Sequence, residues 1–128
     1  MILFVLPNMG DWRFLVKRYR TEKDPKSGNS KYLEVKNCNI GGIAYSNVVK
    51  FYEVDNGLFL KLAWIFRGKS KNIHIPWDEI KHAQEIKSFF GSKYRLIIGD
   101  PFVTFIELAE KDFLKIKSKI KGGVEQLS

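Results

Sequence analysis

The sequence is poor in cysteine and has no long apolar run. A single cysteine, Cys38, excludes a disulfide within the chain. Without a secretory signal, that usage is typical of a protein kept in a reducing cytoplasm. The apolar opening, residues 1–6, has no basic residue before it and ends at Pro7, so it fits neither a signal peptide nor a membrane anchor. No later window reaches the roughly 18 apolar residues of a membrane span. We therefore expect a cytoplasmic protein.

Acidic residues are also scarce relative to basic ones. The chain has 22 Lys and Arg against 14 Asp and Glu, a net charge of +8. Residues 1–50 hold nine of these basic residues against four acidic ones, and residues 51–128 hold thirteen against ten. A basic balance suits nucleic acid or an anionic membrane. This spread favours an ordinary solvated surface, keeps an anionic membrane as an alternative partner, and disfavours nucleic acid.

The length and the aromatic content indicate one domain with a large core. The 128 residues fit a single domain over residues 1–128 and are too few for two ordinary domains. Ten Phe, five Tyr and three Trp favour strands packed around a compact interior.

Residues 1–30 are predicted to hold a helix and a loop. Asp11 is a reasonable N-cap, and four apolar residues follow with helical spacing: Trp12, Leu15, Val16 and Tyr19. Phe14 falls on the opposite face. The polar stretch 21–30, with Pro25 and Gly28, is predicted to be a loop.

From residue 31 the apolar period becomes that of β-strands. The predicted strands are 31–40, 48–54, 58–66, 73–76, 81–90, 93–99 and 102–108. Asn56-Gly57 is a strong signal for a hairpin with a type I′ turn, in which both central residues have positive φ. In the strand after it, the core face is expected to carry Leu58, Leu60, Leu62, Trp64 and Phe66, opposite Phe59, Lys61 and Ala63.

Two further patterns complete the expected fold. Ile73 and Ile75 should point inward and His74 outward, with Pro76 ending the strand and Trp77 filling the core. A helix is predicted over residues 109–121, ended by Gly122-Gly123. Its expected buried stripe is Phe113, Leu114, Ile116, Lys117 and Ile120.

This order of elements predicts a mainly β protein of the α+β class. About seven strands over residues 31–108 followed by a helix match a pleckstrin-homology-like antiparallel barrel capped by its C-terminal helix, here with an added N-terminal helix; lipocalin-like and OB-like barrels remain open. In such a barrel the inward faces converge. One cluster should therefore hold Leu58, Leu60, Leu62, Trp64, Ile73, Ile75, Trp77, Leu96, Ile98, Phe113 and Ile120.

Three segments carry a resemblance to a known group. They are Asp55–Leu60, Phe66-Arg67 and Ile75–Ile80, and together they resemble a pattern "d-x-G-L-y-L … f-R … I-P-W-s-e-I" in small uncharacterised bacterial proteins with a pleckstrin-homology-like, GRAM-like domain. Trp12, Leu15, Val16, Tyr19 and Arg20 are similar to the N-terminal motif of that group. The chain departs from it at Ser70-Lys71-Asn72, where the group has His-Pro-Pro. The resemblance implies a fold and no activity.

Motifs that suggest chemistry have simpler explanations. Residues 63–70 match a loose phosphate-loop pattern, but Pro76 excludes the helix that should follow it. The same proline separates His74 from His82, which disfavours a metal site with Asp78 and Glu79. These two acids are expected to satisfy turn N–H groups or to pair with Lys81. Cys38 has no neighbouring base. We predict no catalytic residue, metal or cofactor.

The function that fits these observations is a non-catalytic module that binds a protein or peptide partner. The alternative is weak attachment to an anionic membrane. The candidate binding residues for it are Arg13, Lys17, Arg18 and Arg20 near the N-terminus and Arg67, Lys69 and Lys71 in a loop. A second alternative is a small-molecule enzyme that uses His74, Asp78, Glu79 or His82. The sequence predicts neither the partner nor the oligomeric state.

Overall fold

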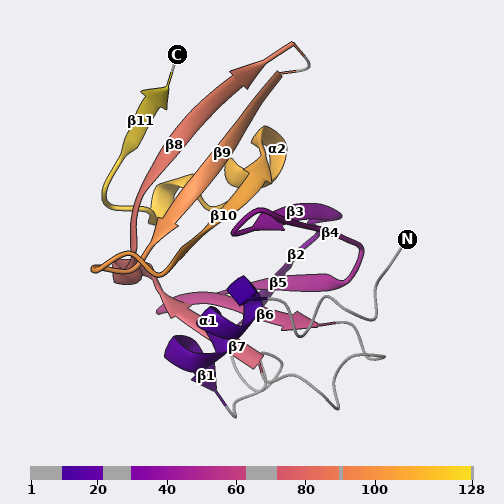
Figure 1. The fold of residues 1–128 in the computed structure, drawn as a ribbon, viewed down its shortest axis with the longest axis vertical. Helices are drawn as coiled ribbons and strands as arrows, with labels where there is room; N and C mark the ends of the chain where they lie inside the picture. The colour runs from indigo at the N-terminus through magenta and orange to yellow at the C-terminus, as the bar shows by residue number, and fades with distance from the viewer. Residues whose placement is uncertain (1–9, 22–29, 63–71, 90, 128) are drawn as a thin grey trace.

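Two β-sheets make up most of the chain in the computed structural model, which describes residues 10–21, 30–62, 72–89 and 91–127 (Figure 1). The first sheet has the strand order β1-β7-β6-β5-β2, and all its pairings are antiparallel. Its strands are β1 (Arg20–Thr21), β2 (Ser30–Leu33), β5 (Val49–Val54), β6 (Gly57–Leu62) and β7 (Asn72–Pro76). The helix α1 (Gly10–Tyr19) leads into β1.

The second sheet has the order β11-β8-β9-β10-β3-β4. Its strands are β3 (Asn37–Ile40), β4 (Ile43–Ser46), β8 (Ile80–Ser88), β9 (Gly91–Ile98), β10 (Thr104–Ala109) and β11 (Val124–Leu127). The chain crosses from β7 to β8 through the 3-10 helix η4 (Trp77–Glu79). The protein is thus mainly β, as predicted, although the pairings of the described residues do not close the two sheets into a barrel.

One contiguous apolar core joins the two sheets. It contains every described residue of the predicted cluster, from Leu58 to Ile120, and it also takes in Trp12 and Leu15 of α1. The predicted core residue Trp64 lies outside the described residues. The inward phase of β7 is confirmed, because Ile73 and Ile75 are fully buried and His74 is half-buried. Alternation of apolar residues was therefore a sound guide to the core face of these strands.

The N-terminal helix also follows its predicted stripe. Trp12, Leu15 and Tyr19 are buried, whereas Phe14 is 52% exposed on the other face. The helix starts at Gly10, so Asp11 lies inside it and is not its N-cap. None of the helices in the described part of the chain is long and apolar enough to cross a membrane.

The hairpin between β5 and β6 forms as predicted, but its turn is not type I′. Val54 pairs with Gly57, so the turn consists of Asp55 and Asn56, and none of these turn residues has a positive φ. Gly57 belongs to β6 and serves a different purpose. A Cβ there would lie 2.5 Å from both the His74 Nε2 and the Ile75 carbonyl oxygen. Gly57 is required for close approach of two strands.

The outer face of β6 is also less exposed than predicted. Phe59 was expected on the solvent side of the strand, but it is only 3% exposed. Its ring lies beside that of His74, with the centroids 6.2 Å apart, and it faces Tyr52 across the β5–β6 pairing. The outer face of β6 is therefore covered at Phe59, in addition to the core face. A strict alternation of buried and exposed positions could not predict this.

The predicted C-terminal helix over residues 109–121 is wrong in length. An α-helix, α2, covers only Glu110–Phe113, and a 3-10 helix, η5, covers Lys117–Lys119. Phe113, Ile116 and Ile120 are buried as predicted, but Leu114 is 56% exposed and Lys117 is exposed. The chain then turns at Gly122-Gly123 and adds β11 in parallel to β8. The glycines thus precede a strand that the sequence analysis did not predict.

The structure has more and shorter strands than the roughly seven expected for such a barrel. The single run predicted over 31–40 is divided into β2 and β3, and β1, β4 and β11 were not predicted. Two or four residues are too few to display a clear apolar period, and pairing with a neighbouring strand defines these elements.

Candidate functional site

An open groove of about 470 Å³ lies between the β5–β6 turn and η4 on one side and the chain around η5 on the other. Three segments of the chain form its walls, around residues 55–56, 74–78 and 118–121. The residues that line it are Asp55, Asn56, His74, Pro76, Trp77, Asp78, Ser118, Lys119 and Lys121.

Trp77 holds one wall of the groove together. Its backbone N–H donates to the Asn56 carbonyl oxygen over 3.4 Å, and its indole N–H donates to the Val54 carbonyl oxygen over 3.3 Å. The ring is only 7% exposed. A hydrogen bond of 3.1 Å also joins the His74 ring to the Asn56 side chain. The two segments that carry the most distinctive sequence pattern, Asp55–Leu60 and Ile75–Ile80, thus lie against each other at this groove.

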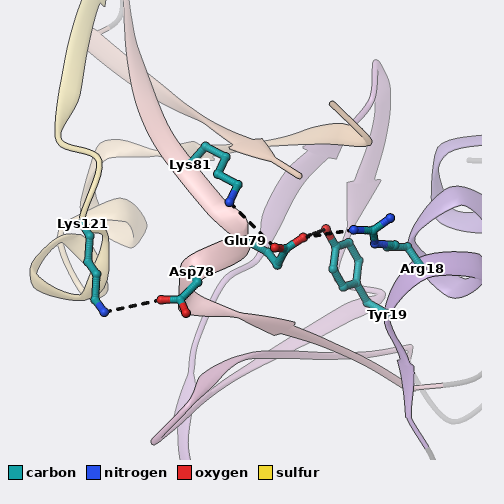
Figure 2. A network of polar contacts seen from close by, with 6 residues as sticks. All are labelled: Arg18, Tyr19, Asp78, Glu79, Lys81 and Lys121. Carbon is teal, nitrogen blue, oxygen red and sulfur yellow. Dashed lines mark hydrogen bonds and ion pairs between the residues drawn. The ribbon is translucent and has the colours of Figure 1, made fainter. Parts of the chain in front are cut away.

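The groove carries charges of both signs. Lys121 Nζ lies 3.4 Å from Asp78 Oδ1, and these side chains are 80% and 77% exposed (Figure 2). Lys119 Nζ lies 3.8 Å from Glu53 Oε2. An ion pair as exposed as Lys121–Asp78 contributes little to stability, so a bound molecule could replace it at low cost. The groove can therefore offer a carboxylate and two ammonium groups to a ligand.

Glu79, next to the groove, is at the centre of a separate polar network (Figure 2). The Tyr19 hydroxyl donates to Glu79 Oε1 over 2.8 Å, and Arg18 and Lys81 each place a nitrogen 3.8 Å from the carboxylate. Burial, reinforced by the hydrogen bond to Glu79, holds the pKa of Tyr19 well above its usual value. The predicted pairing of Glu79 with Lys81 is confirmed. The network ties α1 to the start of β8.

Among the predicted basic residues that the structure describes, none lines the groove. Lys17, Arg18 and Arg20 are exposed on α1 and β1, and Arg18 contacts Glu79. The side chain of Arg13 and all of Arg67, Lys69 and Lys71 lie outside the described residues. Sequence reasoning missed Ser118, Lys119 and Lys121, which reach the site only because the C-terminal segment folds back beside η4.

The residues weighed as an enzyme or metal site are only partly brought together. His74 and Asp78 line the groove, Glu79 faces α1, and His82 lies on β8. Over the described ranges, no three His, Cys, Asp or Glu side chains are placed to hold a metal ion.

The thiol of Cys38 is buried in the core. Only 8% of the residue is exposed, and burial, with a smaller contribution from the charge of Asp112, raises the pKa of the thiol to about 12. Since the thiolate is the reactive form of cysteine, this environment suits a packed side chain and not a nucleophile.

The raised pKa of Cys38 predicts a pH dependence of stability. In the unfolded chain the thiol has its ordinary pKa of 9.0 and loses its proton before the folded protein does. Its contribution to stability is therefore complete below about pH 9 and is lost as the pH rises toward 12. We expect the free energy of unfolding to fall by about 1–2 kcal/mol more in the parent protein than in Cys38→Ala between about pH 8 and 10. Urea titrations of both proteins at about pH 8 and about pH 10 measure these free energies. An equal fall in the two proteins would contradict the prediction.

No protein-family model matches the chain, and no curated protein matches it. The resemblance to pleckstrin-homology-like proteins therefore stays a prediction from the motifs.

Proposed function

We propose that this protein is a non-catalytic binding module that holds a short protein or peptide segment in the groove between η4 and η5. The observation that carries the proposal is the groove itself, with exposed charges of both signs on opposite walls. Its volume of about 470 Å³ lies within the roughly 300–1,000 Å³ usual for ligand pockets.

A peptide suits this surface better than a ligand of one charge. The Asp78 carboxylate can pair with a basic side chain or an amino group, while Lys119 and Lys121 can pair with a carboxylate. Asn56 and Ser118 add side chains that both donate and accept hydrogen bonds to a peptide backbone. Trp77 and Pro76 provide a rigid wall, because the tryptophan is fixed by two hydrogen bonds to the β5–β6 hairpin. A preformed wall lowers the cost of ordering on binding.

The proposal includes the fold family and the location. We interpret the two sheets as an open variant of a pleckstrin-homology-like barrel, supported by the shared core and by the burial of Phe113, Ile116 and Ile120 from the C-terminal segment. A cytoplasmic location is supported by the free thiol of Cys38.

A random peptide library displayed on phage tests the function directly. Peptides selected on the parent protein should bind the Asp78→Lys and Lys121→Asp variants at least about tenfold more weakly. Each substitution places a charge of the same sign beside the ligand group that the original side chain would pair with. The double variant Asp78→Lys, Lys121→Asp keeps the ion pair in reverse and controls for stability. Lys87→Asp, at the far end of β8, changes the net charge as Lys121→Asp does and should bind as the parent does. The proposal would be overturned if no peptide were selected. It would also be overturned if the selected peptides bound Asp78→Lys and Lys121→Asp as tightly as the parent protein.

A further inference from the structure

The most exposed aromatic side chain of the described chain lies at the tip of the β8–β9 hairpin. Phe89 is 104% exposed, which means that its ring makes no packing contact of note. Figure 1 shows this hairpin at one end of the long axis of the molecule. The pairing of β9 with β10 ends at Lys93. On this side the tip therefore extends beyond the neighbouring strand.

The exposed charges on the two strands of this hairpin are positive. Lys87 and Lys93 are both exposed, one on each strand of the hairpin. Glu85, on β8, is only 9% exposed, and its carboxylate accepts a hydrogen bond of 3.0 Å from the Ser92 hydroxyl. Glu110, which follows the Lys93 partner Ala109, is an exposed acid near the base of the tip. The tip thus combines an unpacked aromatic ring with one lysine on each strand, and the only acid on these two strands, Glu85, is nearly buried.

The backbone of the tip is partly satisfied from within. Ser88 pairs with Gly91 across the hairpin, and its hydroxyl donates to the Gly91 carbonyl oxygen over 2.9 Å. A carbonyl group that already accepts a hydrogen bond is less costly to move out of water than a free one.

We propose that the β8–β9 tip is a membrane-docking site that places Phe89 at the interface of an anionic phospholipid bilayer. Aromatic rings are favoured at the level of the lipid headgroups, and anionic headgroups attract nearby lysines. A protein partner fits this tip less well, because a stable protein interface needs about 800 Å² from each side and a narrow convex turn provides far less. A bilayer can surround a convex tip.

This site is distinct from the groove. The nine residues of β8 separate the tip from η4, a span of about 30 Å at the usual rise of a strand. It also uses none of the basic residues selected from the sequence, Arg13 to Arg20 and Arg67 to Lys71. Docking through the tip would leave the groove free for its own ligand.

Co-sedimentation with vesicles tests the proposal. The parent protein should bind phosphatidylcholine vesicles that contain phosphatidylserine and should not bind pure phosphatidylcholine. Phe89→Asp should lower the partition coefficient about tenfold or more, and loss of each lysine in Lys87→Gln and Lys93→Gln should lower it about fivefold. Phe102→Asp is the matched control, since Phe102 is 61% exposed at the other end of β9 and should leave binding unchanged. Melting temperatures should be unchanged in all four variants.

Fluorescence locates the contact. In Phe89→Trp the emission should shift to the blue on addition of the anionic vesicles, and in Phe102→Trp it should not. Equal binding to anionic and neutral lipid, or no binding, would overturn the proposal, and the second result would turn attention to a protein partner at the tip. Anionic binding that is insensitive to Phe89, Lys87 and Lys93 would also overturn it and would favour the other basic residues.

Discussion

Replacement of Trp77 by alanine is expected to lower the free energy of unfolding by about 3–5 kcal/mol, the usual range for truncation of a large buried aromatic side chain. Trp77 is 7% exposed, belongs to the common core, and stands where the chain leaves the first sheet for the second. The substitution also removes the indole donor to the Val54 carbonyl. A loss of this size is a large part of the roughly 5–15 kcal/mol by which domains are stable.

Urea denaturation followed by far-ultraviolet circular dichroism measures the effect of Trp77→Ala. Trp77→Phe is the control, because it keeps most of the ring and removes mainly the hydrogen bond, worth about 1 kcal/mol. We expect the phenylalanine variant to lose less than half as much as the alanine variant. A loss for Trp77→Ala within about 0.5 kcal/mol, the range of ordinary surface changes, would contradict the assignment of Trp77 to the core.

Substitution of Gly57 by alanine is expected to destabilise the protein by about 1–3 kcal/mol, the usual cost of overpacking. The added Cβ would lie 2.5 Å from the Ile75 carbonyl oxygen, which belongs to the backbone of β7 and cannot rotate away. Its other neighbour, His74 Nε2, belongs to a side chain that can move. Since Gly57 has no positive φ, alanine would stabilise this strand by about 0.5–1 kcal/mol if the space were open. A lower free energy of unfolding in Gly57→Ala would therefore indicate close packing at this position, and a higher one would indicate open space.

A double-mutant cycle separates the two contacts of Gly57. In the His74→Ala background the imidazole is gone, so the remaining cost of Gly57→Ala reports the backbone contact alone. We expect that cost to be smaller than in the parent protein and still unfavourable. Stabilisation by Gly57→Ala in the parent protein would show that β6 and β7 do not approach as closely as described.

The sequence predicted the core faces well because burial on one side of a strand leaves a period of two. That signal was clear at Ile73, His74 and Ile75. It failed at the C-terminus, where Phe113, Ile116 and Ile120 are spaced as on a helix yet lie on α2, a turn and the residue after η5. Helical spacing does not distinguish a continuous helix from successive tight turns that bury the same residues. Pairing of β11 with β8 is a tertiary effect with no local signature.

Only some of the residues that line the groove stood out in the sequence. The segments around Asn56 and Trp77 were distinctive, and the structure brings them together. Lys121 joins Asp78 from 43 residues away, and an exposed lysine carries no period that could place it. The described basic residues that were chosen as candidates for membrane attachment lie on α1 and β1, away from the lining of the groove, so the groove does not bear on that prediction.

Chemical-shift mapping tests the proposed function most directly. Amide spectra of the ¹⁵N-labelled protein would be recorded during titration with a peptide selected from the random library. The account predicts shifts that cluster at the β5–β6 turn, at residues 74–78 and at residues 118–121, and that need about tenfold more peptide to develop in the Lys121→Asp variant. Shifts that cluster elsewhere, or shifts at the groove that the variant leaves unchanged, would contradict the groove as the binding site.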